Sequence, residues 1–307
     1  MEHRPLLFAT KYTRKGADPP LERIKNVAAL HDLASYGRCS LTCVIPVLSC
    51  MGVKVCPIPT AVYSSDTGGF GPVYARELTQ EMVCILDKLR AIPARLDGVY
   101  SGYLGSPEQA EIVSRFMHER ECLRVVDPVM GDDGRLYAAF DGRMVHAMRS
   151  LCRGASVITP NLTEAALLLD VPMPAPLSRR EAVDMLDALH RVTDGDAVIT
   201  SALLRDYPDS VCTIARDEES AFAVVAPRVP GTYPGAGDIF TSVLTGALLR
   251  GEVLPAAVRR AAAFVSRCMV YTHEAGAPTR EGVLLERCLA HVLDAPEGVR
   301  TVPLREG

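Results

Sequence analysis

Short runs of apolar and β-branched residues alternate with helical patterns through most of the 307-residue chain. Such alternation predicts parallel strands joined by crossover helices that cover both faces of one sheet. The expected strands are 26–31, 53–59, 98–103, 124–129, 156–159 and 197–200, and the expected helices are 41–51, 77–90, 107–121, 141–151, 162–169, 179–191, 239–249, 255–271 and 280–293. The runs 211–214 and 221–226 have no helix between them and predict an antiparallel hairpin at a sheet edge.

No composition shift or low-complexity linker divides the chain. We therefore expect one α/β domain over 26–295, preceded by a flexible N-terminal extension at 1–25 and followed by a C-terminal tail at 296–307. The hydrophobic fraction of 48% is ample for the core of such a domain.

Bulk properties argue against several classes of protein. The formal net charge of -4 provides no basic field for nucleic acid, and no apolar stretch is long enough to span a membrane. Residues 1–25 lack the apolar core of a signal peptide. The 10 cysteines form no Cys-x-x-Cys pair, and several, such as Cys84 and Cys268, lie in apolar runs. Reduced, buried thiols in a cytoplasmic protein are the expectation.

The segment 234–238 reads Pro-Gly-Ala-Gly-Asp and stands between a polar loop and an apolar stretch. Its two glycines let the backbone turn tightly and bring consecutive amide N–H groups close to an anion. Because a helix is expected next, these amides would lie at its N-terminus, where the helix dipole also favours negative charge. Asp238 at the same point could take a proton from a hydroxyl that attacks phosphorus. An ordinary glycine turn before a helix is the alternative.

Five segments place polar residues directly after expected strands, where open α/β sheets bind ligands. These segments are 31–40, 60–69, 100–106, 126–132 and 158–164. Asp127 follows an apolar strand, and a carboxylate is costly to bury there unless it is paired or binds a cation. Asp127 and Asp132 flank a tight turn and suit Mg²⁺ with retained waters. For Asp132 alone, capping of the turn is the favoured interpretation.

Asn161 and Glu164 fit two interpretations that are only partly compatible. As a helix start, Asn161-Leu162-Thr163-Glu164 predicts a capping box with Asn161 as the N-cap. In a functional interpretation, both side chains point at a nucleotide phosphate and its metal. A Glu that reaches back to the cap is less free to meet a water on Mg²⁺. Thr200 and Ser201, at the end of the next strand, offer hydroxyls for a phosphate.

Together these segments supply an anion hole with a base, carboxylates for a cation, and hydroxyl-bearing loops. That combination indicates phosphoryl transfer, in which positioning and charge neutralisation do most of the work. The chain has no Gly-x-x-x-x-Gly-Lys-Ser/Thr run, which argues against a P-loop kinase. A Gly-x-Ser-x-Gly nucleophile elbow is also absent from the sequence.

These motifs resemble the pyridoxal kinase family of the ribokinase-like superfamily, over roughly 26–293. The segments that carry the resemblance are 101–106, 127–132, 159–161 with Glu164, and 235–238. The segment 32–41 is similar to the branch often labelled pyridoxamine kinase. The resemblance implies a three-layer α/β/α ribokinase-like fold with a central, mostly parallel sheet. It implies a kinase that uses MgATP, is often activated by a monovalent cation such as K⁺, and is usually a homodimer. The implied acceptor is the 5′-hydroxymethyl group of pyridoxal, pyridoxamine or pyridoxine, in salvage of pyridoxal 5′-phosphate.

The resemblance also implies roles for individual residues. Asp238 would be the base, Gly235, Ala236 and Gly237 would stabilise the transferring phosphoryl group, and Asp127 and Glu164 would help to hold Mg²⁺ through waters. The residues implied near ATP are Asp132, Asn161, Glu164, Thr200, Ser201 and Thr232. Thr60 and Tyr103 would lie at the pyridine ring.

The chain departs from the better-known family members on the acceptor side. Asp32 stands where their pattern has a Ser that contacts the ring, and Ser65-Asp66 replaces an Asn-His pair. The segment 38–40 lacks their Gly-Asn pair and is one residue shorter. We hypothesise that Asp32 pairs with a protonated ring nitrogen or with the amine of pyridoxamine, and we place Asp66 at the substrate. Two alternatives stay open: a kinase for hydroxymethylpyrimidine or another small alcohol, and a non-catalytic protein that binds vitamers or pyridoxal 5′-phosphate.

Overall fold

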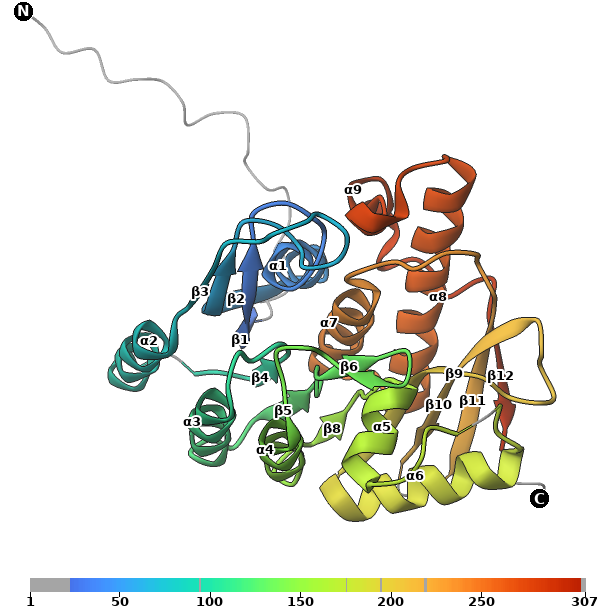
Figure 1. The fold of residues 1–307 in the computed structure, drawn as a ribbon, viewed down its shortest axis with the longest axis horizontal. Helices are drawn as coiled ribbons and strands as arrows, with labels where there is room; N and C mark the ends of the chain where they lie inside the picture. The colour runs from blue at the N-terminus through green and yellow to red at the C-terminus, as the bar shows by residue number, and fades with distance from the viewer. Residues whose placement is uncertain (1–22, 94, 175, 194, 218–219, 305–307) are drawn as a thin grey trace, which may run out of the picture.

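The computed structural model describes residues 23–93, 95–174, 176–193, 195–217 and 220–304. They form a ten-stranded sheet with helices on both faces, so the predicted three-layer α/β/α architecture is confirmed (Figure 1). The extension predicted at 1–25 lies outside the described residues as far as residue 22. Lys25 already belongs to the first strand, β1 (Lys25–Ala34).

The centre of the sheet is parallel, as the alternating pattern predicts. Its six strands lie in the order β9 (Asp196–Ala202), β8 (Val157–Ile158), β5 (Leu123–Val126), β4 (Gly98–Ser101), β1 and β2 (Val53–Tyr63). Parallel strands covered on both faces are apolar almost throughout, which is why the sequence reveals them. The strand β2 continues past the predicted end at 59, so Thr60 lies within a strand rather than in a loop.

The predicted hairpin forms from β10 (Ser210–Arg216) and β11 (Ala221–Pro227), but its predicted place at the edge is wrong. A further strand, β12 (Arg300–Pro303), pairs antiparallel with β11 and forms that edge. This strand lies in the segment 296–307, which the sequence predicts to be a tail. The amide of the buried Leu304 also donates to the carbonyl of Ala221 at 3.0 Å. Four residues are too few for a strand pattern to stand out in the sequence.

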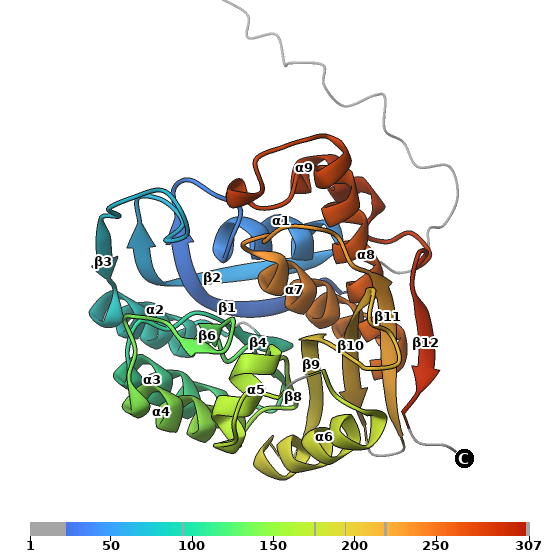
Figure 2. The same ribbon diagram turned by 45° about the vertical axis from the view of Figure 1, so that its right-hand side comes forward.

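The helices form two layers, one on each face of the sheet (Figure 2). One layer contains α2 (Thr79–Ala91), α3 (Pro107–His118), α4 (Gly142–Cys152), α5 (Leu162–Leu169) and α6 (Arg179–Thr193). The other contains α1 (Leu41–Cys50), α7 (Ala236–Leu249), α8 (Leu254–Glu274) and α9 (Leu285–Cys288). Alternate strand residues point to opposite faces, so Ala28 and Leu30 pack in one core and Val27 and Ala29 in the other. Among the described helices, none combines the length and apolar character that crossing a bilayer requires.

The helix α2 starts later than predicted because Ala75–Glu77 forms β3, which pairs antiparallel with β2 at the second edge of the sheet. Within α2 only Met82 and Leu86 are buried. Cys84 is exposed, so its predicted burial is wrong, while Cys268 is buried as predicted. An apolar run buries only the residues on one face of a helix, and the run alone does not say which. All 10 cysteines are free thiols.

The continuous helix predicted at 280–293 is wrong. The segment instead contains a 3-10 turn at Thr279–Glu281, the short α9, and a second 3-10 turn at Leu289–His291. Gly282 separates the first two with a left-handed φ of 77°, and a Cβ there would lie 2.9 Å from the carbonyl oxygen of Arg38. Arg38 follows β1, so a tertiary contact rather than the local sequence determines this break.

Candidate active site

The glycine motif lies at the start of α7, which begins at Ala236 rather than at the predicted residue 239. Gly235 is the N-cap residue, with a left-handed φ of 78°. The amide of Ala236 donates to the carbonyl of Tyr233 at 3.2 Å, and Gly237 and Asp238 follow in the first turn. The motif therefore stands at a helix N-terminus, which is the geometry that an anion hole requires.

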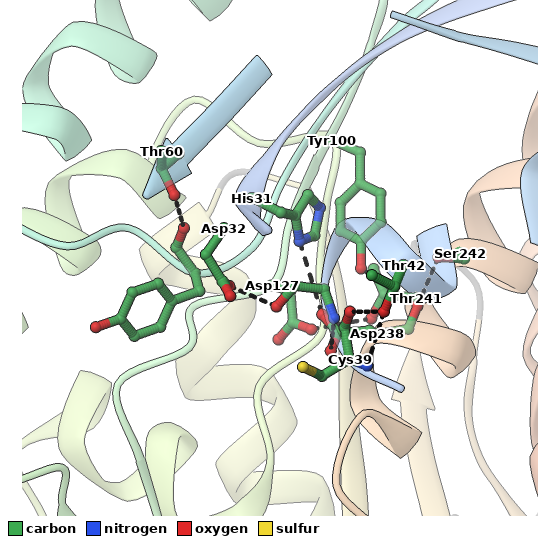
Figure 3. Close-up of polar contacts among 12 residues, drawn as sticks. His31, Asp32, Cys39, Thr42, Thr60, Tyr100, Asp127, Asp238, Thr241 and Ser242 are labelled. Atoms are coloured by element: carbon green, nitrogen blue, oxygen red, sulfur yellow. Dashed lines mark hydrogen bonds and ion pairs between the residues drawn. The ribbon is translucent and has the colours of Figure 1, made fainter. Parts of the chain in front are cut away.

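The side chain of Asp238 faces the loop that follows β1 (Figure 3). Its Oδ2 accepts a hydrogen bond from the amide of Ser40 at 2.8 Å, and its Oδ1 lies 3.6 Å from Nδ1 of His31. Ser40 has φ 49°, a left-handed value that costs about 1–3 kcal/mol for a residue with a side chain. No sequence signal identifies Ser40 or His31 as neighbours of Asp238, because β1 and α7 are distant in the chain.

The loop after β1 packs directly against Gly235. A Cβ at Gly235 would lie 1.9 Å from the carbonyl oxygen of Arg38, so only glycine fits there. The Nε of Arg38 donates to both carboxylate oxygens of Glu286, each at 2.9 Å. The segment beyond α8 thus holds this loop from outside, while the start of α7 contacts it from inside.

Asp32 is buried at the end of β1 and joins the same network. The hydroxyl of Ser40 donates to Oδ1 of Asp32 at 2.5 Å, so Ser40 bridges Asp32 and Asp238. Burial raises the pKa of Asp32 to about 7, although the hydrogen bond from Ser40 opposes that rise. Asp32 therefore lies next to the predicted base, and its acceptor-side role stays a prediction.

Asp127 follows β5, and its carboxyl is buried beside the start of α7. Burial, reinforced by the negative charges of Glu164 and Asp238, raises its pKa well above its usual range. The hydroxyl of Thr241 donates weakly to its Oδ2, at 3.4 Å, and a Cβ at Gly237 would lie 3.9 Å from the same oxygen. A buried carboxyl so placed fits a cation held between it and an anion at the helix N-terminus.

The capping-box interpretation of Asn161 and Glu164 is confirmed. The amide of Glu164 donates to Asn161 Oδ1 at 2.9 Å, and Glu164 Oε2 accepts from the amide of Asn161 at 2.8 Å. The other carboxylate oxygen, Oε1, accepts from the amide of Met130 at 3.1 Å. Burial raises the pKa of Glu164 to about 8. Glu164 therefore stabilises the loops around Asp127, and a contact with a metal through water stays a prediction.

Most of the residues predicted near ATP lie close together, and Thr232 lies in a separate loop. Asn161 and Thr200 form a parallel bridge, and Asn161 Nδ2 donates to the carbonyl of Gly131 at 2.8 Å, next to the exposed Asp132. The structure thus brings Asn161, Thr200 and the Asp132 turn together. Ser201 adjoins Thr200 and is exposed with φ 56°. Thr232 is exposed in the loop between β11 and α7.

On the acceptor side, the structure brings Thr60 and Tyr103 into contact, and their position at the pyridine ring stays a prediction. The hydroxyl of Thr60 donates to the carbonyl of Tyr103 at 2.9 Å. The hydroxyls of Tyr63 and Tyr103 lie 3.1 Å apart, and the Phe140 ring lies 5.6 Å from the Tyr103 ring. Sequence reasoning singled out neither Tyr63, the last residue of β2, nor Phe140, which lies in the loop before α4.

Asp66 has a local role in the loop after β2. Its Oδ1 accepts from the amide of Gly68 at 2.6 Å, which closes a turn. Its amide donates to the carbonyl of Tyr36 at 2.7 Å, so the loops after β1 and β2 contact each other. A contact between the Asp66 carboxyl and substrate stays a prediction.

Comparison with known proteins supports the fold and identifies the family. The sequence profile of the phosphomethylpyrimidine kinase family matches residues 45–281. The chain belongs to this family, within the ribokinase-like superfamily.

Its relatives include kinases of B6 vitamers. A pyridoxine/pyridoxal/pyridoxamine kinase of Bordetella pertussis is 31% identical over 274 residues, which is 82% of this chain and 90% of the relative. A crystal structure from Bacteroides thetaiotaomicron, of a protein provisionally named phosphomethylpyrimidine kinase and in a form with pyridoxal, has 41% identity and a TM-score of 0.86. It covers 91% of this chain and 100% of its own. The pyridoxal kinase of Lactobacillus plantarum has 31% identity and a TM-score of 0.82, with coverage of 88% and 97%.

The close approach at Gly235 generates a stability prediction. Gly235→Ala places a Cβ against the Arg38 carbonyl, whereas Gly251→Ala meets no atom within 4 Å at a similar left-handed φ of 88°. Both variants incur the backbone cost of about 1–2 kcal/mol, but only Gly235→Ala must also move the loop after β1. Urea unfolding should therefore show a clearly larger loss of stability for Gly235→Ala. Equal losses would contradict the packing described here.

The raised pKa of Asp32 generates a pH prediction. The folded state binds a proton more tightly than the unfolded state, whose Asp pKa is about 4, so the wild-type protein loses stability as pH rises from about 4 to about 7. Asp32→Asn removes this titration. Its stability relative to wild type should rise across that window, by at most about 4 kcal/mol.

Urea unfolding at several pH values measures the difference. Asp184→Asn, which removes an exposed carboxyl on α6, is the control and should show no such trend. If the difference in unfolding free energy between Asp32→Asn and wild type does not change with pH, the raised pKa of Asp32 is wrong.

Proposed function

We propose that this protein transfers the γ-phosphate of ATP to the 5′-hydroxymethyl group of a B6 vitamer: pyridoxal, pyridoxamine or pyridoxine. The observation that carries the proposal is the position of Asp238 in the first turn of α7, beside the buried Asp127 and the loop after β1. A base, an anion-binding helix N-terminus and a buried carboxyl meet at one point. Phosphoryl transfer to a hydroxyl needs these three components.

Asp238 would accept the proton of the 5′-hydroxyl as its oxygen attacks phosphorus. The hydrogen bond from the Ser40 amide to Oδ2 fixes the carboxylate while leaving lone pairs for that proton. Gly235, Ala236 and Gly237 would stabilise the charge that develops on the phosphoryl oxygens, because the N-terminus of α7 favours negative charge.

Mg²⁺ fits the carboxyl of Asp127, which is buried and, among the described residues, receives only the weak contact from Thr241. Among the described residues, no three Asp, Glu, His or Cys side chains converge into a ready-made metal cage. Mg²⁺ bound with retained waters and substrate phosphates does not need one, and it neutralises phosphate charge when bound. Asp127 would hold the ion, with Glu164 as a more distant support. Asp132, Asn161, Thr200, Ser201 and Thr232 would surround the nucleotide.

On the acceptor side, Tyr103 and Thr60 would lie at the pyridine ring, and Asp32 would face its polar groups. The relatives support this acceptor, since one carries the name pyridoxine/pyridoxal/pyridoxamine kinase and another was crystallised with pyridoxal. The family is named after a phosphomethylpyrimidine, so a pyrimidine acceptor such as hydroxymethylpyrimidine remains the alternative. The homodimer, the monovalent cation and the cytoplasmic location stay predictions, and the free state of the cysteines supports a reducing compartment.

Steady-state kinetics on a panel of alcohols tests the acceptor. With MgATP, kcat/KM for at least one of pyridoxal, pyridoxamine and pyridoxine should exceed that for hydroxymethylpyrimidine. A preference for hydroxymethylpyrimidine over all three vitamers would overturn the acceptor assignment and leave the kinase assignment intact.

Asp238→Asn tests the chemistry. Loss of the base should lower kcat by about 100- to 10,000-fold, while calorimetry should show nearly unchanged ATP binding because the amides of the motif remain. Asp184→Asn on α6 is the control and should keep wild-type kcat. A wild-type protein that binds vitamers without ATP-dependent phosphorylation would instead support the non-catalytic alternative.

A further inference from the structure

We propose that His31 is a positioning residue for Asp238, a role that rests on the proposed function. His31 lies on β1 with its side chain fully buried, and its Nδ1 lies 3.6 Å from Oδ1 of Asp238 (Figure 3). This separation is slightly beyond hydrogen-bond range. Contacts between catalytic groups are often long without substrate and shorten in the reacting complex.

The imidazole of His31 is buried, so its ring nitrogens need hydrogen-bond partners within the protein. Neither ring nitrogen of His31 has a hydrogen-bond partner among the described residues. A buried polar group without a hydrogen-bond partner destabilises the folded state. A small movement of Asp238 toward Nδ1 would satisfy one of the two nitrogens, so the interaction favours the orientation in which Oδ1 faces β1.

The neighbouring strand holds the ring in place. A Cβ at Gly102 would lie 2.2 Å from both Nδ1 and Cε1 of His31, so the imidazole occupies the space that a side chain at 102 would need. The Tyr100 ring meets the imidazole edge-on, at 4.3 Å between ring centroids and an interplanar angle of 80°. The ring therefore has little freedom to turn away from Asp238.

His31 and Ser40 act on different oxygens of the same carboxylate. Ser40 holds Oδ2 through its amide, and His31 faces Oδ1. The imidazole N–H of His31, on β1, and the amide of Ser40, at the far end of the loop after β1, would together fix the rotation of the Asp238 carboxylate. We assign the Nδ1–H tautomer to His31 in this contact, because the bond to a carboxylate requires a donor at that nitrogen. The imidazole orients the base and transfers no proton itself.

Kinetics of two variants test this role. His31→Leu removes the donor and keeps an apolar side chain, whereas His31→Asn keeps an N–H near the position of Nδ1. We expect His31→Leu to lower kcat by about 100-fold, the scale of a 1 Å misplacement, with little change in KM for ATP or the vitamer. His31→Asn should recover a large part of kcat. A matched pair at the half-buried His190, which bonds to the Gly195 carbonyl at 2.7 Å, should leave kcat unchanged.

A spectroscopic measurement tests the contact without catalysis. In protein labelled with ¹⁵N-histidine, the His31 signals are identified by their loss in His31→Asn. We expect Nδ1 to carry the proton in wild type, and its signal to shift in Asp238→Asn but not in Asp184→Asn. A wild-type protein without turnover would overturn the proposed function, and the spectra would still decide the contact.

Three results would overturn the positioning role. One is a protonated Nε2 with bare Nδ1 in wild type. Another is wild-type kcat in His31→Leu. The third is an equal loss of kcat in the Leu and Asn variants when both melt at the wild-type temperature.

Discussion

The concentration of carboxyl groups at one helix N-terminus is the constraint on which the rest of the site depends. Asp32 and Asp127 are buried there beside the partly exposed Asp238, and burial raises the pKa of Asp32 and Asp127. Such crowding is unfavourable unless donors and cations offset it. The Ser40 amide and hydroxyl and the N-terminus of α7 supply the donors. The negative charge that these donors leave unbalanced suits a bound metal ion, which would also offset the charge of a nucleotide phosphate.

Backbone packing keeps these groups in place. The loop after β1 runs between the start of α7 and the segment beyond α8. A Cβ at Gly235 would lie 1.9 Å from the Arg38 carbonyl oxygen, and a Cβ at Gly282 would lie 2.9 Å from it. The pairing of Arg38 with Glu286 closes the arrangement from the solvent side. The distorted backbone at Ser40 is maintained by these contacts, and it directs both donors of Ser40 to carboxylates. Stability and site geometry are therefore coupled through one loop.

Most of the fold could be predicted because strands that are buried on both faces appear in the sequence as nearly continuous apolar runs. The runs at β1, β4 and β5 are apolar for that reason, and α5 occupies the predicted bounds because Asn161 caps it. The edge strands β3 and β12 show no such run, since they are short and largely exposed. The prediction of a helix at 280–293 was wrong because Gly282 packs against Arg38, and no local pattern in the sequence encodes that contact.

The sequence alone determined the type of chemistry, because the glycine–aspartate motif and the strand-end carboxylates are local patterns with direct physical meaning. The resemblance to the family pointed to Thr60, Tyr103, Asp32 and Asp66 as candidates on the acceptor side. Only the tertiary structure decided how they are arranged: Glu164 uses both oxygens in backbone contacts, Asp66 closes its own turn, and Ser40 joins Asp32 to Asp238. Only the tertiary structure likewise placed the buried His31 beside Asp238. Such relations depend on which strand ends and helix termini meet, and residues so distant in the chain leave no periodic signal.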